Sequence, residues 1–225
     1  MGFLEKLAGI LLPPRCIFCG GLLEPGKALQ ICGGCYPEIP FAEEAVVRTR
    51  AEGAGPACDG ALCVCEYSGV VRESLIRFKF YGKPGYYRTF ARLISDRMRK
   101  LGYDGAFDMV VSVPLHRQKE YQRGYNQARL ISKALSRGLR LPERSRLLKR
   151  CRNTRTQSLL DRSGRRSNIA NAFEVTAPRE VKDRSILLVD DIMTTGYTLE
   201  ECARMLKGAG AVFVMAAVVA TGRKF

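Results

Sequence analysis

The sequence predicts an α/β protein in which a parallel sheet flanked by helices follows a small four-cysteine zinc ribbon. After residue 60, short apolar runs alternate with segments of helical length, which is typical of βαβ units and a parallel sheet. Before residue 43, four cysteines form two closely spaced pairs in a turn-rich segment. A chain of 225 residues is long enough for one such domain and a small satellite.

Composition divides the chain into three parts. We predict a zinc-binding ribbon with an N-terminal helix over residues 1–42, a linker over 43–59 and the α/β domain over 60–225. The linker is predicted because acidic residues, glycines and a proline replace large apolar residues there. Residues 1–12 place apolar side chains on one helical face, which indicates a docking helix or, alternatively, a peripheral membrane anchor.

Charge and cysteine content narrow the function classes. Residues 1–60 hold 5 Lys and Arg against 7 Asp and Glu, whereas the rest of the chain holds 32 against 15. Such a basic region attracts phosphates, nucleic acid or anionic lipid, or else only keeps the surface soluble. Nine cysteines, an odd number, argue against a disulfide framework and for a reducing compartment. Without a long apolar run or a signal peptide, we expect a cytoplasmic protein, at most peripheral at the inner face of the membrane.

The predicted elements alternate along the α/β domain. We expect strands over residues 62–67, 107–113, 185–189 and 211–219, and helices over residues 70–79, 87–101, 126–139 and 198–207. The runs that begin at residues 185 and 211 are almost continuously apolar, as in strands buried on both faces. Ligands of such sheets bind at the carboxyl ends of strands, so the residues after Val113 and Val189 are the first candidates for a site.

Two adjacent acidic residues follow the apolar strand that ends at Val189. Asp190 and Asp191 are succeeded by a hydroxyl-rich loop, Thr194 to Thr198, which opens a helix. Backbone N–H groups at a helix N-terminus hold phosphate, and carboxylates accept hydrogen bonds from sugar hydroxyls. The pattern therefore indicates a ligand with a phosphate at one end and a diol at the other, such as ribose 5-phosphate. An ordinary strand-to-helix turn with capping side chains is the alternative.

This segment resembles the phosphoribosyl pyrophosphate (PRPP) signature of type I phosphoribosyltransferases, which residues 186–198 match at every position. The resemblance implies the type I phosphoribosyltransferase fold, with the acidic pair on the ribose diol and the threonine loop on the 5′-phosphate. It also implies Mg²⁺ that bridges pyrophosphate and ribose oxygens rather than lying in an all-protein cage. The residues it assigns to PRPP here are Asp190, Asp191, Met193, Thr194, Thr195, Gly196, Tyr197 and Thr198.

Basic residues follow the other strand end, at Val113. In the type I fold the pyrophosphate loop leaves a neighbouring strand of the same sheet, where cations would meet the diphosphate with charge-assisted hydrogen bonds. Arg123 is the preferred pyrophosphate ligand, and Arg123, Asp190 and Asp191 are the predicted catalytic residues. A solvated basic turn is the alternative. The other residues predicted to bind PRPP from this segment are Val113, Pro114, Arg117 and Lys119.

Four cysteines carry the spacing of a metal site. Cys16 and Cys19 are separated by two residues, and after twelve more residues Cys32 and Cys35 repeat that spacing. The pattern is typical of a tetrahedral zinc site built from two thiolate knuckles. Four protein ligands leave no open position, so the expected role is structural, and a redox pair is the alternative.

Other reactive side chains have less definite roles. Cys58, Cys63 and Cys65 are more often small core residues than ligands. His116 is the single histidine, and a lone histidine is more often a structural hydrogen-bonding group than a catalyst. None of the four is assigned a chemical role.

A strongly basic stretch precedes the acidic-pair strand. Residues 140–166 hold ten Lys and Arg and two acidic residues. This composition is consistent with a loop near the ligand, with contacts to the backbone of single-stranded nucleic acid, or with a solvated loop. The absence of interleaved aromatic residues weakens base stacking as an explanation. The candidate nucleic-acid contacts are Arg150, Arg155, Arg165 and Arg166.

Taken together, these motifs resemble the ComF family of competence-associated proteins over nearly the whole chain. Further marks are the segments 67–69, 78–80, 113–116 and 123–127, with Tyr125 where the family usually has Phe. The resemblance implies binding of PRPP or a related phosphoribosyl ligand, import of single-stranded DNA and a helicase-like ATPase partner. The alternative is an active phosphoribosyltransferase that transfers ribose 5-phosphate to an unidentified amine or base. No N-terminal glutaminase nucleophile is evident, so amidotransferase activity is not expected.

Overall fold

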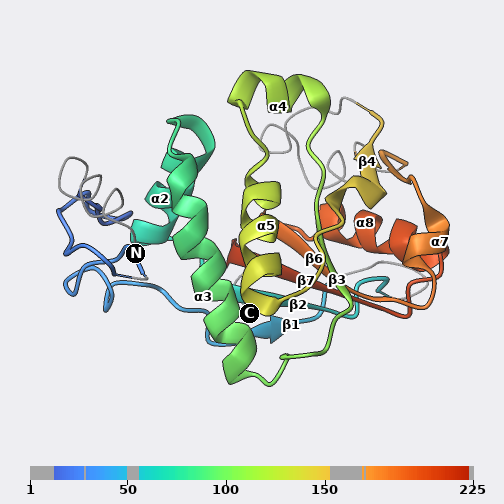
Figure 1. Cartoon of the computed structure of the whole chain (residues 1–225), viewed down its shortest axis with the longest axis horizontal. Helices are drawn as coiled ribbons and strands as arrows, with labels where there is room; N and C mark the ends of the chain where they lie inside the picture. Colours follow the sequence, from blue (N-terminus) through green and yellow to red (C-terminus); the bar gives the residue numbers. More distant parts are fainter. Residues whose placement is uncertain (1–12, 28, 50–55, 153–168, 170, 223–225) are drawn as a thin grey trace.

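A five-stranded sheet forms the centre of the computed structural model, which describes residues 13–27, 29–49, 56–152, 169 and 171–222. The strand order is β1-β2-β7-β6-β3 (Figure 1). The neighbouring pairs β2–β7, β7–β6 and β6–β3 are parallel, and only β1 is antiparallel to its neighbour. The strands are β1 (Val46–Val47), β2 (Gly60–Glu66), β3 (Met109–Ser112), β6 (Ser185–Met193) and β7 (Phe213–Thr221).

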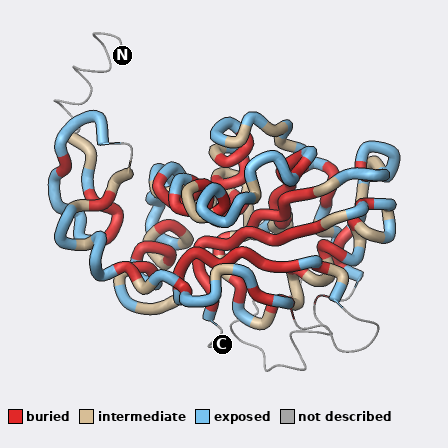
Figure 2. The backbone as a smooth tube through the Cα atoms, turned by 90° about the horizontal axis from the view of Figure 1, so that it is seen from below, coloured by how far each residue is buried: buried red, intermediate tan, exposed pale blue. Residues whose placement is uncertain are grey.

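Helices cover both faces of this sheet. Successive residues of a strand point to opposite faces, so Leu187 and Val189 join one core while Ile186 and Leu188 join the other. Because both faces are covered, β6 and β7 need almost unbroken apolar sequences, and Figure 2 shows the central strands as buried. The first core holds residues of α2 (Gly69–Phe80), α3 (Tyr87–Lys100) and α5 (Gln127–Leu139), and the second those of α8 (Tyr197–Gly208).

Short elements connect the main ones. An antiparallel pair, β4 and β5, lies outside the main sheet. One short helix, α4, follows β3 and stands at the edge of the molecule (Figure 1). The remaining bounds are η1 (Pro84–Tyr86), α4 (Arg117–Arg123), η2 (Ser145–Leu147), β4 (Leu148–Arg150), β5 (Phe173–Val175) and α7 (Pro178–Val181).

The structure corrects three of the predicted boundaries. Part of the predicted linker over 43–59 belongs to the sheet as β1, where Val47 is 3% exposed. β6 continues beyond Val189 because Ile192 and Met193 pair with the end of β7, so the acidic pair lies within a strand rather than in a loop. The segment after β3, predicted as the loop that meets the pyrophosphate, contains the helix α4.

The cysteine-rich module packs against the helices of the first core. Ile17 and Phe18, which lie between the first two cysteines, are buried in that core. The Arg77 guanidinium on α2 donates hydrogen bonds to their carbonyl oxygens, at 3.1 and 2.6 Å. The module is therefore held on α2 by both apolar burial and charge-assisted hydrogen bonds. The predicted helix over residues 1–12 lies outside the described residues.

Within the described part of the chain, no helix combines the length and the apolar character that crossing a membrane requires.

Candidate functional site

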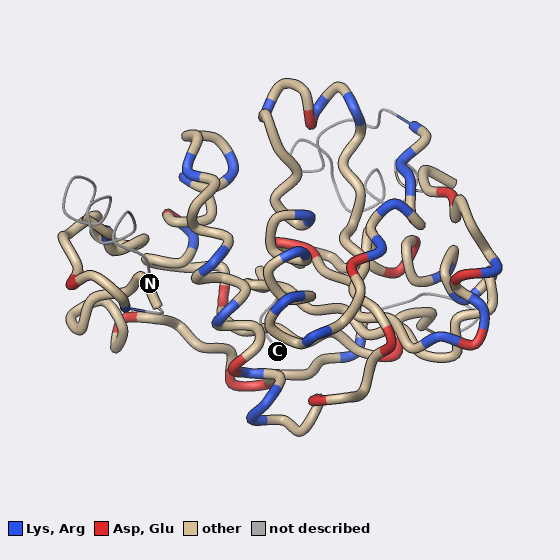
Figure 3. The backbone as a smooth tube through the Cα atoms, viewed as in Figure 1, with Lys and Arg blue, Asp and Glu red and all other residues tan. Residues whose placement is uncertain are grey.

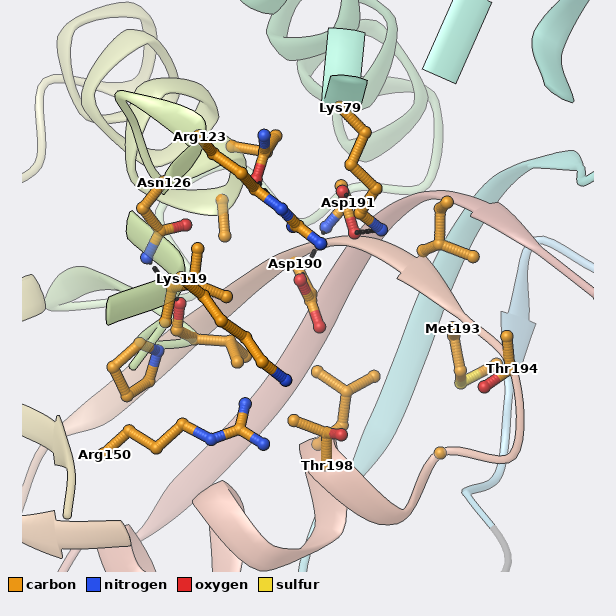
Figure 4. A pocket seen from close by; sticks show the side chains of 18 of the residues that line it. Lys79, Lys119, Arg123, Asn126, Arg150, Asp190, Asp191, Met193, Thr194 and Thr198 are labelled. Atoms are coloured by element: carbon orange, nitrogen blue, oxygen red, sulfur yellow. Dashed lines mark hydrogen bonds and ion pairs between the residues drawn. The ribbon is translucent and has the colours of Figure 1, made fainter. Parts of the chain in front are cut away.

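A cavity of about 370 Å³ opens where the carboxyl ends of β3 and β6 meet. This is the edge at which ligands bind to open parallel sheets. Segments far apart in the sequence contribute its walls: the end of α2, the segment from Val113 to α5, β4, and the end of β6 with the loop that follows. Figure 4 shows side chains from these segments pointing toward one another.

The acidic pair occupies the end of β6. Asp191 is 6% exposed, and both of its carboxylate oxygens contact the Lys79 ammonium group, at 3.0 and 3.2 Å. The Asp190 carboxylate accepts a hydrogen bond from the backbone N–H of Asp191, at 2.8 Å. Burial and the neighbouring Asp191 charge raise the pKa of Asp190 to about 7. The site therefore holds one paired carboxylate and one that titrates near neutral pH.

Lys79 is the charged residue in the wall of this cavity to which sequence reasoning gave no role. It lies near the C-terminal end of α2 and reaches Asp191 across 112 residues of sequence. An apolar helix pattern predicts where Lys79 lies on α2 but not which strand that helix end faces. The only signal was its place between two phenylalanines in one of the segments that resemble the ComF family.

The threonine loop turns directly into α8. Gly196 adopts φ +88° immediately before the helix, a left-handed conformation that suits glycine because it has no Cβ. Thr194, Thr195, Gly196 and Thr198 all line the cavity. Backbone N–H groups of the first turn of α8 are therefore placed beside hydroxyl groups, which is the chemistry of a phosphate cradle.

Cations from two other segments form the opposite wall. Lys119 and Arg123 come from α4 and Arg150 from β4 (Figure 4). The Arg123 guanidinium lies 5.2 Å from the centroid of the Phe80 ring and donates to the Gln127 side-chain oxygen at 3.4 Å. Burial, together with the charges of Arg150 and Arg123, lowers the pKa of Lys119. Crowded cations of this kind favour an anionic ligand.

Asn126 and Tyr125 fix the segment that carries these cations. The Asn126 amide group donates to the Val113 carbonyl at 3.1 Å, and its side-chain oxygen caps α5 at the Arg129 N–H. The Tyr125 hydroxyl donates to the Phe78 carbonyl on α2, so the tyrosine found in place of phenylalanine makes a bond that phenylalanine could not.

The structure brings together most, but not all, of the predicted site residues. Arg117 lines a neighbouring cavity instead, and Tyr197 does not line the first cavity. Arg150, predicted as a nucleic-acid contact, lines the first cavity, whereas Arg155, Arg165 and Arg166 lie outside the described residues. The predicted residues that line the first cavity are Val113, Pro114, Lys119, Arg123, Asp190, Asp191, Met193, Thr194, Thr195, Gly196 and Thr198.

Residues left without a role prove structural in their contacts. The His116 Nδ1 atom accepts a hydrogen bond from the Gln118 N–H and caps α4. Cys58, Cys63 and Cys65 are each 1% exposed or less. The Cys58 thiol donates to the Gly60 carbonyl, and burial raises its pKa to about 11.

The four cysteines of the N-terminal module converge on one point. The Sγ atoms of Cys16, Cys19, Cys32 and Cys35 all lie within 4.8 Å of one another, with 3.7 Å between those of Cys19 and Cys32. Four sulfurs about 2.3 Å from one tetrahedral ion would be about 3.8 Å apart. Backbone N–H groups of Gly21 and Cys32 point at two of the sulfurs, each at 3.4 Å. The cluster therefore fits a tetrahedral metal ion such as zinc.

The raised pKa of Asp190 predicts a pH-dependent effect of Asp190→Asn on stability. Between about pH 4 and 7 the folded state holds the Asp190 proton more tightly than the unfolded state, so the wild type loses this stabilisation as pH rises through that range. The variant, which is neutral throughout, should exceed the wild type in unfolding free energy by about 1–2 kcal/mol at pH 8, a value discounted for the open cavity. The advantage should vanish near pH 4.

Urea unfolding at the two pH values tests this prediction. Exposed Asp104→Asn is the matched control and should show no such pH dependence. An equal effect of Asp190→Asn at pH 4 and pH 8 would contradict the assigned pKa.

Comparisons with known proteins agree with this geometry. A phosphoribosyl transferase domain model matches residues 125–224. Competence protein F of Haemophilus influenzae is 33% identical over 214 residues, which are 87% of this chain and 92% of that protein. DNA utilization protein YhgH of Escherichia coli K12 is 40% identical over 107 residues, 48% of this chain and 46% of that protein. Competence protein ComFC of Bacillus subtilis is 32% identical over 148 residues, 65% and 58% of the two chains.

The family assignment follows from the extent of these matches. The domain model and the mostly parallel sheet with helices on both faces confirm the predicted type I phosphoribosyltransferase fold. The likeness to competence protein F, 33% identical over 87% of this chain and 92% of that protein, extends well beyond the residues that the domain model matches. The chain therefore belongs to the ComF family.

Proposed function

We propose that this protein binds PRPP in the cavity at the ends of β3 and β6 and acts in the handling of imported DNA. The observation that carries the proposal is the convergence of three groups in one cavity. These are the acidic pair of β6, the threonine loop that opens α8, and a wall of cations from α4 and β4. PRPP has three chemical parts, a diol, a 5′-phosphate and a 1′-diphosphate, and each group suits one of them.

The acidic pair and the threonine loop are assigned to the ribose 5-phosphate half. The carboxylates of Asp190 and Asp191 accept hydrogen bonds from the 2′- and 3′-hydroxyls. The N–H groups and hydroxyls between Thr194 and Thr198 hold the 5′-phosphate at the start of α8. Because β6 runs directly into this loop, a single segment spans the sugar and its phosphate.

The cations are assigned to the pyrophosphate. Lys119 and Arg123 donate charge-assisted hydrogen bonds to it, and Arg150 adds to the positive field. Lys79 neutralises the Asp191 carboxylate, which lowers its repulsion of the diphosphate. Apart from the four cysteines, the described residues offer no cluster of three metal-ligating side chains. Mg²⁺ is therefore proposed to arrive with PRPP and to add positive charge at the pyrophosphate.

The same arrangement supports an alternative, an active phosphoribosyltransferase. Displacement of pyrophosphate from C1′ builds negative charge on the leaving group, and Arg123 would stabilise that charge while Asp190 and Asp191 hold the sugar. The amine or base that would accept the ribose 5-phosphate is not assigned. Release of pyrophosphate from PRPP in the presence of an acceptor distinguishes this enzyme from a protein that only binds PRPP.

A role in DNA handling is supported by the relatives, whose names concern competence and DNA utilization. It is also supported by the basic residues that surround β4, since cations bind the backbone of single-stranded DNA. We propose that the protein contacts imported single-stranded DNA at the cytoplasmic face of the membrane, together with a helicase-like ATPase.

Zinc is proposed to hold the four-cysteine cluster as a structural ion. When bound, it would cross-link the knuckle of Cys16 and Cys19 to that of Cys32 and Cys35. The ion has no part in the chemistry of the PRPP cavity.

Neutralisation of the acidic pair should weaken PRPP binding. Calorimetric titration with PRPP and Mg²⁺ should show an affinity at least about tenfold weaker for Asp190→Asn/Asp191→Asn, since two charge-assisted contacts to the diol are weakened. The control is Asp104→Asn/Asp183→Asn, which removes the same charge from exposed positions. Equal affinity of the acidic-pair variant and the control would contradict the proposed site.

Loss of a single cysteine should release zinc. Metal analysis should find one zinc per wild-type chain, and Cys16→Ser should lose it together with protection of the ribbon from proteolysis. Cys151→Ser, at an exposed cysteine outside the cluster, should keep the metal. Retained zinc in Cys16→Ser would disprove the ligand set.

Single-stranded DNA binding should depend steeply on salt. Four phosphate contacts would lower affinity about 50-fold between about 50 and about 200 mM salt, because each contact releases bound counterions. Fluorescence anisotropy of a labelled oligonucleotide over a salt series measures this slope. A flat slope, or no binding at the lowest salt, would contradict direct DNA contact.

A further inference from the structure

A second cavity, of about 450 Å³, adjoins the first. The two share walls formed by Pro114, Leu115, Asn126 and Arg150. The acidic pair and the threonine loop line only the first cavity, so the second one lacks every group assigned to the ribose 5-phosphate half of PRPP. Most of its other lining residues come from α4, α5 and the segment from η2 through β4.

The second cavity is strongly basic. Only one acidic residue, Glu120, is part of its wall. Figure 3 shows basic positions along the segment from η2 through β4, which forms one side. The basic residues of the wall are Arg117, Arg129, Arg146, Lys149 and Arg150.

Four of these cations have no carboxylate partner among the described residues: Arg117, Arg129, Arg146 and Lys149. The Arg129 Nε–H is also buried without a hydrogen-bond acceptor there. Nearby Arg144, by contrast, lies outside the cavity and pairs with Glu180. A buried donor without a partner is costly, so the Arg129 Nε–H needs an acceptor that the described residues do not supply. Arg117, Arg146 and Lys149 are exposed, and they add positive charge at the mouth of the cavity.

We propose that the second cavity binds a small phosphate-bearing molecule, a phosphomonoester or a diphosphate, separately from PRPP. Arginine side chains match phosphate oxygens with paired hydrogen bonds, and several converge here. The volume is in the range of small-molecule sites. Pro114, Leu115 and Leu148 give one apolar side, which suits the body of a nucleotide or sugar phosphate.

Calorimetric titration of the full chain at about 150 mM salt tests the proposal, with inorganic pyrophosphate, AMP and ribose 5-phosphate as separate probes. The test variant is Arg146→Gln/Lys149→Gln, which alters two exposed side chains of the second cavity. Arg123→Gln alters a residue that lines only the first cavity. Lys100→Gln/Arg137→Gln, at exposed positions in α3 and α5, removes the same charge away from both cavities.

We expect at least one of the three probes to bind the wild type with a stoichiometry of one. The same probe should bind the Arg146→Gln/Lys149→Gln variant at least about tenfold more weakly. Arg123→Gln and the charge-matched control should keep that binding. Comparison of the affinities for the three probes shows whether the cavity prefers a diphosphate, a nucleotide or a sugar phosphate. Because Arg123→Gln affects only the first cavity, failure of the PRPP proposal leaves this result unchanged.

Three outcomes would overturn the proposal. The first is that every probe either fails to bind or binds the wild type and the Arg146→Gln/Lys149→Gln variant with equal affinity. The second is an equal loss in the charge-matched control, which would indicate diffuse electrostatic attraction. The third is that only single-stranded DNA, added as a further probe, depends on those two residues.

Discussion

Two adjacent carboxylates lie at the end of a buried strand, and the groups that compensate their charges form the cavity around them. Asp190 and Asp191 extend β6 beyond its apolar part, where burial and mutual repulsion both disfavour their charges. Lys79 compensates at Asp191, and the positive charge of Arg150 acts at Asp190. The cations around the cavity thus balance the acids in the free protein, and the same cations provide the field that an anionic ligand needs. The balance is incomplete at Asp190, whose pKa stays raised, so neutralising Asp190 relieves repulsion within the acidic pair while Lys79 keeps Asp191 as its partner.

Helix α2 relates this cavity to the cysteine module. On one side of α2, Arg77 holds the carbonyl groups of Ile17 and Phe18. Two residues later, the Lys79 ammonium group contacts Asp191 of the acidic pair. Phe78, which lies between Arg77 and Lys79, accepts a hydrogen bond from the Tyr125 hydroxyl at its carbonyl oxygen. The C-terminal part of α2 therefore contacts the first cysteine knuckle, the end of β6 and the segment before α5. This explains how a small module outside the sheet packs as part of the same core.

Much of the fold could be predicted from the sequence, because its signals are local. Apolar runs of β6 and β7 indicated strands buried on both faces, and the cysteine spacing indicated a cluster whose sulfurs do converge. The edge strand β1 was missed because two residues in a glycine- and glutamate-rich segment carry no strand pattern. Lys79 and the wall position of Arg150 could not be predicted, since both depend on how segments distant in the sequence pack. Arg117, predicted to bind PRPP, lines the second cavity rather than the first, and this too depends on how α4 packs.

A crystal structure of the protein with PRPP and Mg²⁺ would show whether PRPP occupies the cavity at the ends of β3 and β6, and in which orientation. We expect the ribose diol within hydrogen-bond distance of Asp190 and Asp191, the 5′-phosphate between Thr194 and Thr198, and the diphosphate beside Arg123. Electron density for PRPP in any other orientation, or at another place on the protein, would contradict this expectation.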